Sequence, residues 1–439
     1  MYKKLGLIVV LFMLGSTLLF SQEEPQKLEL TLEEAQAYAL ENNLQVKNTI
    51  LDIEAARKKV WETTAIGLPQ VNGAVDYQHI PGNLPTFDFT DPMTGESSPI
   101  ELGVKNSTTY SVTLSQLVFS GEYIVGLQAS KTYLQISKLS HEKTELDTRE
   151  NVMNSYLSAL ILERNKSILD SSLANIKKLL KETTKMYEQG FLQSTDVDQL
   201  TITYNTLLNS QKSVERQLDI SYKLFKILLG ADIDSRLVLT DALNQLEERL
   251  LTEYDGMNEF KLDQNIDYRL MKNQEEVSEL NLKREKTKYL PSLNAFYSYQ
   301  DKTNKAAFDF TINHIIGVQA SIPLFSSFQR NAVVQQAKIE LEKNKNNKAL
   351  LENNLRTQAT QARFTYKNAV EKYTIAGQNM KLAKNIMENT AKKYKEGMAS
   401  SMEFTQANDK YLQTQSDYIN ALFEVFSAKI ALDKLLNEL

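Results

Sequence analysis

The amino-acid sequence predicts a mainly α-helical protein with a small β part, built from a helix-strand-strand-helix-helix unit that occurs twice. Three observations predict this fold class: the composition, an internal duplication, and hydrophobic periods of two kinds. Glycine and proline number only 15 and 8 among 439 residues, and long stretches are rich in Leu, Ala, Lys, Glu, Asn and Gln. This composition favours extended helices over compact α/β domains.

The first 22 residues have the pattern of an export signal peptide. Lys3 and Lys4 form a short basic region, an apolar stretch at 5–20 follows, and small residues lie near Ser21. We expect cleavage near Ser21 or Gln22. A transmembrane anchor is the weaker interpretation, because the apolar stretch is short for a bilayer span.

Charge and residue content argue against several functional classes. The formal net charge of −5 argues against nucleic-acid binding. The sequence has no cysteine, which excludes disulfides, thiolate metal sites and a lipid anchor on an N-terminal cysteine. His79, His141 and His314 lie far apart without metal-ligand spacing, and no phosphate loop, nucleophile elbow or dinucleotide turn occurs. We therefore expect no enzyme activity, no catalytic residues, no cofactor and no metal.

The duplication is visible as three pairs of similar segments. Two of the pairs are separated by about 207 positions and the first by about 222, so the first copy carries roughly 15 extra residues. Those residues lie in a proline- and glycine-rich loop at 79–107. The pairs are TAIGLPQVNGAVDYQ (64–78) with TKYLPSLNAFYSYQ (287–300), SQLVFSGEY (115–123) with SIPLFSSFQ (321–329), and YEQGFLQSTDV (187–197) with YKEGMASSMEF (394–404).

The duplication predicts two repeats joined by a linker. The first repeat is expected at 23–230, with strands at about 70–78 and 109–119 and a helical hairpin tip at about 190–194. The second is expected at 263–439, with strands at about 292–300 and 308–322 and a tip at about 397–401. The linker at 231–262 interrupts the helical pattern, and we expect it to pack as a small belt around the helices.

The predicted strands alternate between apolar and polar residues. In the first strand Val71, Val75 and Tyr77 alternate with Asn72 and Asp76. Strands of about ten residues with this period suit a membrane barrel, although a soluble half-buried sheet has the same alternation. No segment after residue 22 is a continuous apolar stretch of membrane-helix length, so a membrane crossing would have to use strands.

Four strands cannot form a closed barrel from one chain. An open sheet in lipid would leave backbone groups at its edges unpaired, so a membrane location requires several copies. Two copies give eight strands and a filled interior, whereas three give twelve and begin to leave a passage. The polar inward faces favour three copies.

The helical segments carry a sustained period of 3.5 residues. From Leu355 to Met387, apolar or small residues recur at steps of four and three. Such a repeat produces a supercoil, and its many alanines imply a close approach between helices. The predicted helix at about 122–188 would extend on the order of 100 Å at 1.5 Å per residue.

The order and duplication of these motifs resemble the TolC family of outer-membrane efflux proteins, over about residues 28–437. The motifs are the strand starts LPQV and LPSL, the strand-to-helix turns LVFSG and PLFSS, and the helix reversals YEQGFLQSTDV and YKEGMASSMEF. The resemblance implies a homotrimer whose chains contribute four strands each to a 12-stranded β-barrel in outer-membrane lipid. A long coiled-coil-like α-barrel would continue it through the periplasm.

The resemblance also implies partners and a function. The trimer would be the channel-tunnel of a tripartite efflux or type I secretion system. It would give passive exit to substrates delivered by an inner-membrane pump, of RND or ABC type, and a periplasmic adaptor (membrane fusion) protein. A soluble periplasmic coiled-coil scaffold is the alternative; it explains the heptads but not the alternating strands or the long loop.

The two helix reversals are the candidate sites. Gly190 and Gly397 are expected to end their helices in a left-handed conformation. We expect the following helices to be capped by a serine or threonine, at 194 or 195 in the first copy and at 400 or 401 in the second. The resemblance makes the tips the adaptor-docking surface. The residues of that surface are Gly190, Phe191, Leu192, Gln193, Ser194, Gly397, Met398, Ala399 and Ser400.

Three acidic residues follow the tips and have two interpretations. Asp196, Asp198 and Glu403 lie in the first turn of the next helix, where the helix dipole favours negative charge, so they could serve only as capping residues. The resemblance adds a functional interpretation, an acidic ring at a narrowed pore entrance. Gln406 stands where the family suggests a further acid.

Overall fold

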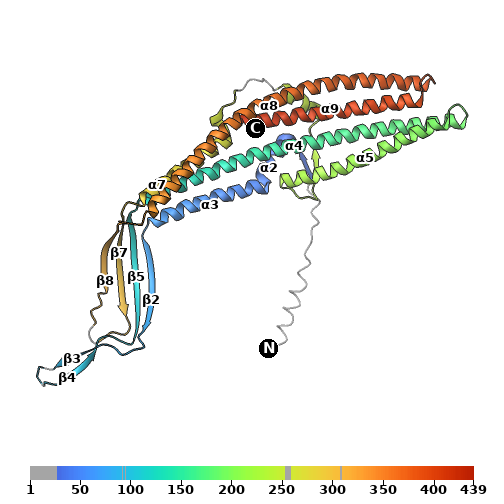
Figure 1. Ribbon diagram of the computed structural model, residues 1–439. Helices are drawn as coiled ribbons and strands as arrows, with labels where there is room; N and C mark the ends of the chain where they lie inside the picture. The colour runs from blue at the N-terminus through green and yellow to red at the C-terminus, as the bar shows by residue number, and fades with distance from the viewer. Residues whose placement is uncertain (1–26, 91, 94, 253–258, 307–308) are drawn as a thin grey trace, which may run out of the picture. The chain divides into compact units, whose positions relative to one another are not determined.

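The computed structural model describes residues 27–90, 92–93, 95–252, 259–306 and 309–439 (Figure 1). The predicted export signal lies outside the described residues. The elements up to the linker are β1 (Lys27–Leu30), α2 (Leu32–Asn42), α3 (Leu44–Ile66), β2 (Gln70–His79), β3 (Thr86–Thr90), β4 (Ser97–Glu101), β5 (Asn106–Phe119), α4 (Gly121–Glu188) and α5 (Ser194–Leu229). The remaining elements are β6 (Arg236–Leu239), α6 (Leu243–Thr252), a 3-10 turn (Leu262–Gln264), α7 (Ile266–Thr287), β7 (Ser292–Lys302), β8 (His314–Ser321), α8 (Gln329–Lys395) and α9 (Ser401–Leu436).

The chain divides into two compact units, and each unit draws on both sequence repeats. We call them the tip unit and the sheet unit. The tip unit contains the described residues of 27–44, 148–256 and 366–430. The sheet unit contains the described residues of 45–147, 257–365 and 431–439.

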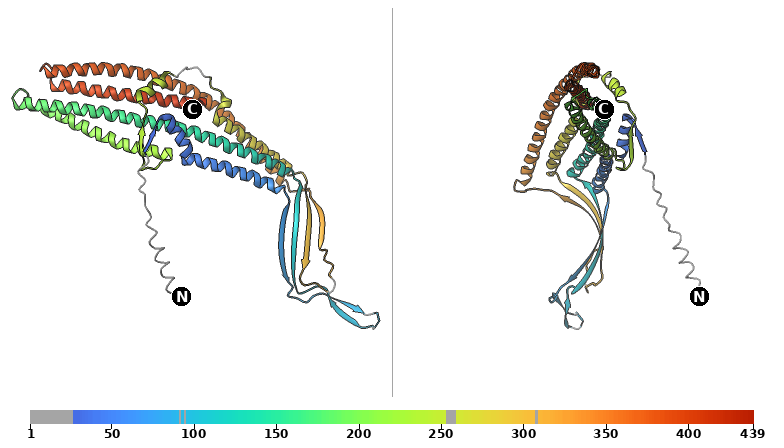
Figure 2. Two further views of the ribbon diagram at one scale, coloured as in Figure 1. Left: turned by 180° about the vertical axis from the view of Figure 1, so that it is seen from behind. Right: turned by 90° about the vertical axis from the view of Figure 1, so that its right-hand side faces the viewer.

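The sheet unit holds an antiparallel sheet with the strand order β2-β5-β7-β8 (Figure 2). Its register confirms the predicted alternation. Val112 lies opposite Gly73 and Tyr299, and the next row, Asn72, Thr113 and Ser298, is polar. The hydroxyls of Thr113 and Ser298 are 2.9 Å apart. Because opposite residues share a face, the sheet has one apolar and one polar face, as the sequence predicted.

The predicted loop at 79–107 contains a second hairpin, which corrects the sequence-based prediction. β3 pairs with β4 in an antiparallel ladder from Thr86 opposite Glu101 to Thr90 opposite Ser97. The alternating stretch TFDFT was the missed signal, because five residues are too few to stand out within a segment rich in proline and glycine.

The strand predicted at about 308–322 begins later, at His314. The side chain of Asp309 accepts a hydrogen bond from the backbone N–H of Thr311 at 3.0 Å. A short-range bond of this kind forms a turn that competes with an extended strand. The side chain of Asn313 then donates to the carbonyl of Gln300 at 2.9 Å, where the ladder with β7 resumes.

The helical seam predicted from residue 355 is buried as expected. The most enclosed seam residues are Leu355, Ala359, Tyr366, Ala369, Ala376 and Ala383. Gly377 on α8 faces the ring of Tyr418 on α9, because an added Cβ there would lie 3.4 Å from Cε2 of Tyr418. The glycine therefore leaves room for this ring between the two helices.

Residues of the predicted linker pack against the long helices of the tip unit. β6 forms a parallel pair with β1, a pairing that the sequence did not predict. The buried hydroxyl of Tyr156 donates to the carbonyl of Leu30 at 3.1 Å and accepts from the N–H of Asp241 at 3.3 Å. On α6, the carboxylate of Glu247 accepts hydrogen bonds from the hydroxyls of Tyr373 and Tyr418. Within the described ranges, we find no helix with the length and apolar character needed to cross a membrane.

Candidate functional site

The two helix reversals are built in the same way around glycine. Gly190 and Gly397 have φ angles of +83° and +73°, which confirms the predicted left-handed conformation. The N–H of Gly190 donates to the carbonyl of Tyr187 at 2.9 Å, and the N–H of Phe191 donates to the carbonyl of Met186 at 2.9 Å. The second tip has the equivalent two bonds, at 3.1 and 2.8 Å. This Schellman arrangement satisfies the last carbonyls of α4 and α8 and reverses the chain in few residues.

The second tip is closed by a capping box. The hydroxyl of Ser400 accepts from the N–H of Glu403 at 3.2 Å, and the carboxylate of Glu403 accepts from the N–H of Ser400 at 2.8 Å. Of the two predicted cap residues, Ser400 is therefore the one that caps α9. The carboxylate of Glu403 accepts hydrogen bonds from the Ser400 N–H and, with a smaller effect, from the Ser400 hydroxyl. These two bonds hold the pKa of Glu403 below its usual value.

At the first tip the predicted cap is wrong. The cap position belongs to Gln193, and Ser194 is already the first residue of α5. The N–H of Gln193 donates to the carboxylate of Asp196 at 3.3 Å, in the same three-residue spacing as Ser400 and Glu403. Ser194 and Thr195 were predicted because serine and threonine are preferred cap residues. The residue three positions before the acid Asp196 is Gln193, so this spacing would have indicated the correct cap.

Asp196 also joins the two hairpins. Its second carboxylate oxygen accepts from the hydroxyl of Ser401 at 2.5 Å, and the side chain of Ser401 is buried. Asp198 and Glu403 are exposed. The structure therefore brings Asp196 to the opposite hairpin, while Glu403 closes on its own helix start.

A second polar contact lies deeper in the same unit. The hydroxyls of Thr183 on α4 and Tyr394 on α8 are 2.9 Å apart. The ring of Tyr394 stacks on Phe404 with centroids 5.8 Å apart, and burial raises the pKa of Tyr394. No role was predicted for these residues from the sequence. The available signal was Thr183 itself, a polar residue within an otherwise apolar seam.

The tips line an open pocket of about 730 Å³ within the tip unit. Residues from both predicted docking segments line it, namely Leu192, Gln193, Gly397, Ala399 and Ser400, together with Asp196. Two other predicted docking residues, Phe191 and Met398, are apolar and are 75% and 66% exposed. Gly190 and Ser194 are exposed as well. The arrangement combines small residues, exposed apolar side chains and polar links between the hairpins.

Across the described ranges, no group of three His, Asp or Glu side chains is placed to hold a metal ion.

Comparisons with known proteins agree with this architecture. The family model described as outer membrane efflux protein matches residues 37–231 and 262–438. The chain is 21% identical to outer membrane protein TolC of Vibrio cholerae serotype O1 over 312 residues, which cover 70% of this chain and 67% of the relative. It is 24% identical to TolC of Salmonella enteritidis over 312 residues, and this alignment covers 67% of this chain and 59% of that relative.

Solved channels share the fold at low sequence identity. The CmeC outer membrane channel of Campylobacter jejuni superposes with a TM-score of 0.75 and 17% identity over 93% of this chain and 85% of that chain. The open-state MtrE channel of Neisseria gonorrhoeae gives a TM-score of 0.70 and 13% identity over 92% and 88%. The family match spans most of the sequence. We conclude that the chain belongs to the outer membrane efflux protein family, is TolC-like, and resides in the outer membrane with an extension into the periplasm.

Proposed function

We propose that the protein is the trimeric exit channel of a tripartite efflux or type I secretion system. The observation that carries this proposal is a four-stranded sheet with two free edges in the same chain as two capped helical hairpins. β2 and β8 are the outer strands of that sheet. In lipid their unpaired backbone groups would be costly, and pairing β2 of one copy with β8 of the next would satisfy them.

The exposed side chains of the sheet support its placement in lipid. Val71, Val75, Ile316 and Val318 are between 65% and 83% exposed in the single chain. So many apolar side chains on the surface of one chain indicate that lipid or another protein surface covers them in the assembled protein. Three copies supply twelve strands, enough for a passage along the polar face. Substrates would leave through this passage passively.

The hairpin tips are the proposed contact with the adaptor protein, which would connect the channel to an inner-membrane pump of RND or ABC type. The small residues Gly397, Ala399 and Ser400 leave room for the closely approaching tips of partner helices. Phe191 and Met398 add exposed apolar area beside them. Because a protein interface needs an apolar centre with a polar rim, this combination fits a docking surface.

The same tips form the proposed pore entrance. Three copies of Asp196, Asp198 and Glu403 around one axis would make a ring of carboxylates that favours cations. The bond between Ser401 and Asp196 holds neighbouring hairpins together. We propose that this bond favours the closed entrance and that substrate passage requires it to break.

The assembly is tested by extraction and mass measurement. The full-length protein should require detergent, and native mass spectrometry should give three chains. A monomer that stays in the soluble periplasmic fraction would overturn the proposal and favour the coiled-coil scaffold.

The docking surface is tested by bulky replacements at the second tip. Gly397→Trp or Ser400→Trp should abolish efflux of the system's substrates while the trimer persists, because the ring blocks close helix approach. Lys384→Trp is a matched control, since Lys384 lies on α8 away from the tip with its side chain 54% exposed. Wild-type drug resistance in the tip variants would refute the docking surface.

A further inference from the structure

The β3–β4 hairpin has one apolar and one polar face. Phe87 lies opposite Ile100 in the ladder, and Phe89 is two positions along the same strand. Opposite residues share a face, so these three side chains lie together. Phe87 and Phe89 are 58% and 48% exposed. The other face carries polar residues, among them Asp88 and Glu101.

The hairpin projects from the end of the sheet that lies away from the helices, within the sheet unit (Figures 1 and 2). It connects β2, an edge strand, to β5. A copy that pairs with β2 would therefore lie next to the hairpin. The second sequence repeat has no equivalent hairpin among the described residues, so the feature belongs to the first repeat.

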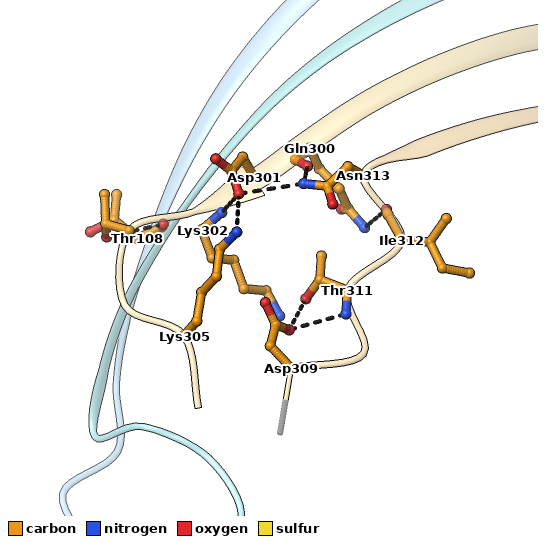
Figure 3. Close-up of polar contacts among 10 residues, drawn as sticks. Thr108, Gln300, Asp301, Lys302, Lys305, Asp309, Thr311, Ile312 and Asn313 are labelled. Carbon is orange, nitrogen blue, oxygen red and sulfur yellow. Dashed lines mark hydrogen bonds and ion pairs between the residues drawn. The ribbon is translucent and has the colours of Figure 1, made fainter. Parts of the chain in front are cut away.

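Apolar groups are also displayed by the β7–β8 connection at the same end of the sheet. Phe310 and Ile312 are 88% and 66% exposed. Polar bonds hold the chain around them (Figure 3). The side chain of Gln300 donates to the carbonyl of Ile312 at 3.2 Å, and Lys305 forms an ion pair with Asp301 at 2.9 Å. Phe310 and Ile312 thus lie in a segment, 309–313, whose neighbours are held by local hydrogen bonds.

We propose that neighbouring copies cover these apolar faces in the assembled channel. Phe87, Phe89 and Ile100 of one copy pack on the hairpin and the β7–β8 connection of the next. The three hairpins form a collar that narrows the exit. This inference rests on the proposed trimeric barrel, but it concerns the outer end of the channel, which that function leaves open.

The dimensions of a twelve-stranded barrel permit such a collar. Strands about 4.8 Å apart and tilted by about 40° give a barrel radius of roughly 12 Å. Each strand of the hairpin has 5 residues. At about 3.3 Å per residue the hairpin is roughly 17 Å long, so it is long enough to reach the central axis of the mouth.

A second copy of the chain is the partner that best fits the apolar and polar faces of the β3–β4 hairpin. The polar face of the hairpin can remain in water while the apolar face meets the apolar groups of a neighbour. An isolated two-stranded hairpin is marginally stable in water, so packing against another chain would also stabilise its ladder. The neighbour is already held in place by the edge strand from which the hairpin continues.

Photo-crosslinking tests the contact directly. A benzophenone amino acid is placed at Phe89 on the apolar face or, as a control, at Asp88 on the polar face, in the full-length protein in cells. Irradiation at Phe89 should give at least about five times more chain-to-chain adduct than at Asp88, mapping to 84–104 or 309–313 of a second chain. Adducts with lipopolysaccharide, or equal yields at both positions, would overturn the collar.

The rate at which a reagent reaches the barrel interior tests whether the collar narrows the exit. The chain has no cysteine, so Thr113→Cys on the polar sheet face gives a single reactive thiol. The thiol is labelled from outside the cell with a maleimide attached to a 5 kDa polyethylene glycol. In the double variant Phe87→Ser, Phe89→Ser the labelling rate should rise several-fold. Thr86→Ser with Asp88→Ser should leave the labelling rate unchanged.

Native mass measurement separates the two proposals. If the three-chain assembly is present but neither the adduct nor the labelling change occurs, the collar alone fails. If no three-chain assembly exists, the proposed channel function fails together with the collar.

Discussion

The two helix reversals have matching sequences but use their acidic residues differently. At the tip of α8 and α9, the hydrogen bonds of Glu403 among the described residues are to Ser400, at the start of its own helix. At the tip of α4 and α5, Asp196 bonds to Gln193 and also to Ser401 of the opposite hairpin. Both acids therefore bond to their own helix starts, and Asp196 additionally links the two hairpins. On the proposed function, Asp196 is therefore the acid whose contact with the opposite hairpin would favour the closed entrance.

The largest expected effect comes from removing that link. Ser401→Ala deletes the hydroxyl bonded to Asp196 and leaves the bond from Gln193 in place. A hydrogen bond to a charged group contributes about 2 kcal/mol, so the open population of each hairpin should rise about 30-fold. Planar-bilayer recordings should show a higher mean conductance for Ser401→Ala.

The neighbouring serine is the matched control for this prediction. Ser400→Ala alters the cap of α9 without touching the link to Asp196, so conductance should stay close to that of the parent. Equal conductance of the two alanine variants would mean that the Ser401–Asp196 bond does not control the entrance.

The second prediction concerns the exposed acids. Asp198→Asn together with Glu403→Gln removes two charges per copy, six per trimer, from the proposed entrance ring. Because a ring of carboxylates attracts cations and repels anions, the ratio of cation to anion permeability should fall about two- to three-fold. Asp219→Asn, on α5 with its side chain 64% exposed, provides a control away from the tip. Unchanged selectivity in the double variant would leave these acids as helix caps only.

Much of the fold was predictable because its signals repeat. The period-two strands and the seam from Leu355 each extend over many residues, and the duplication supplies each signal twice. The pairing of β1 with β6 was not predictable, since two strands of 4 residues separated by most of a repeat carry no readable period. β8 begins late because a local turn at Asp309 outweighs the apolar alternation around Phe310.

The candidate site also has parts that could be predicted from the sequence and parts that could not. The left-handed glycines and the Ser400–Glu403 box are local and could be read from short motifs. The bond between Ser401 and Asp196 joins residues 205 positions apart, and nothing in either segment specifies the other. Contacts between hairpins depend on how the supercoil aligns them, which the period alone does not fix.

The third prediction tests the feature that the two tips share. An alanine at Gly190 or Gly397 would keep a left-handed backbone at a cost of about 1–2 kcal/mol. Apart from the adjacent residues, no described atom lies within 4 Å of an added Cβ at either glycine, so the cost arises from the backbone alone and should be equal at the two tips. Hydrogen exchange of the flanking amides should quicken equally in both alanine variants. Asparagine, which tolerates this conformation better, should restore part of the protection.

The smallest expected effect separates the two caps. Gln193→Ala keeps the backbone N–H that bonds to Asp196, so exchange at the start of α5 should change little. Ser400→Ala loses a hydroxyl that accepts from the N–H of Glu403, at a cost of about 1 kcal/mol, so exchange at the start of α9 should quicken about five-fold at pH 7. Equal responses at the two helix starts would show that the caps do not differ.

The pH dependence of the second cap follows from the lowered pKa of Glu403. A carboxyl whose pKa is lower in the folded state stabilises that state above its usual pKa of 4.5, and this contribution is lost as pH falls through the folded-state pKa. Protection factors at the start of α9 should therefore be constant from pH 7 to about pH 5 and decrease in more acidic solution. In Glu403→Gln the same amides should show lower protection at pH 7 and no further decrease on acidification. A parallel acid-induced decrease in that variant would assign the titration to another group and remove Glu403 from the account of this tip.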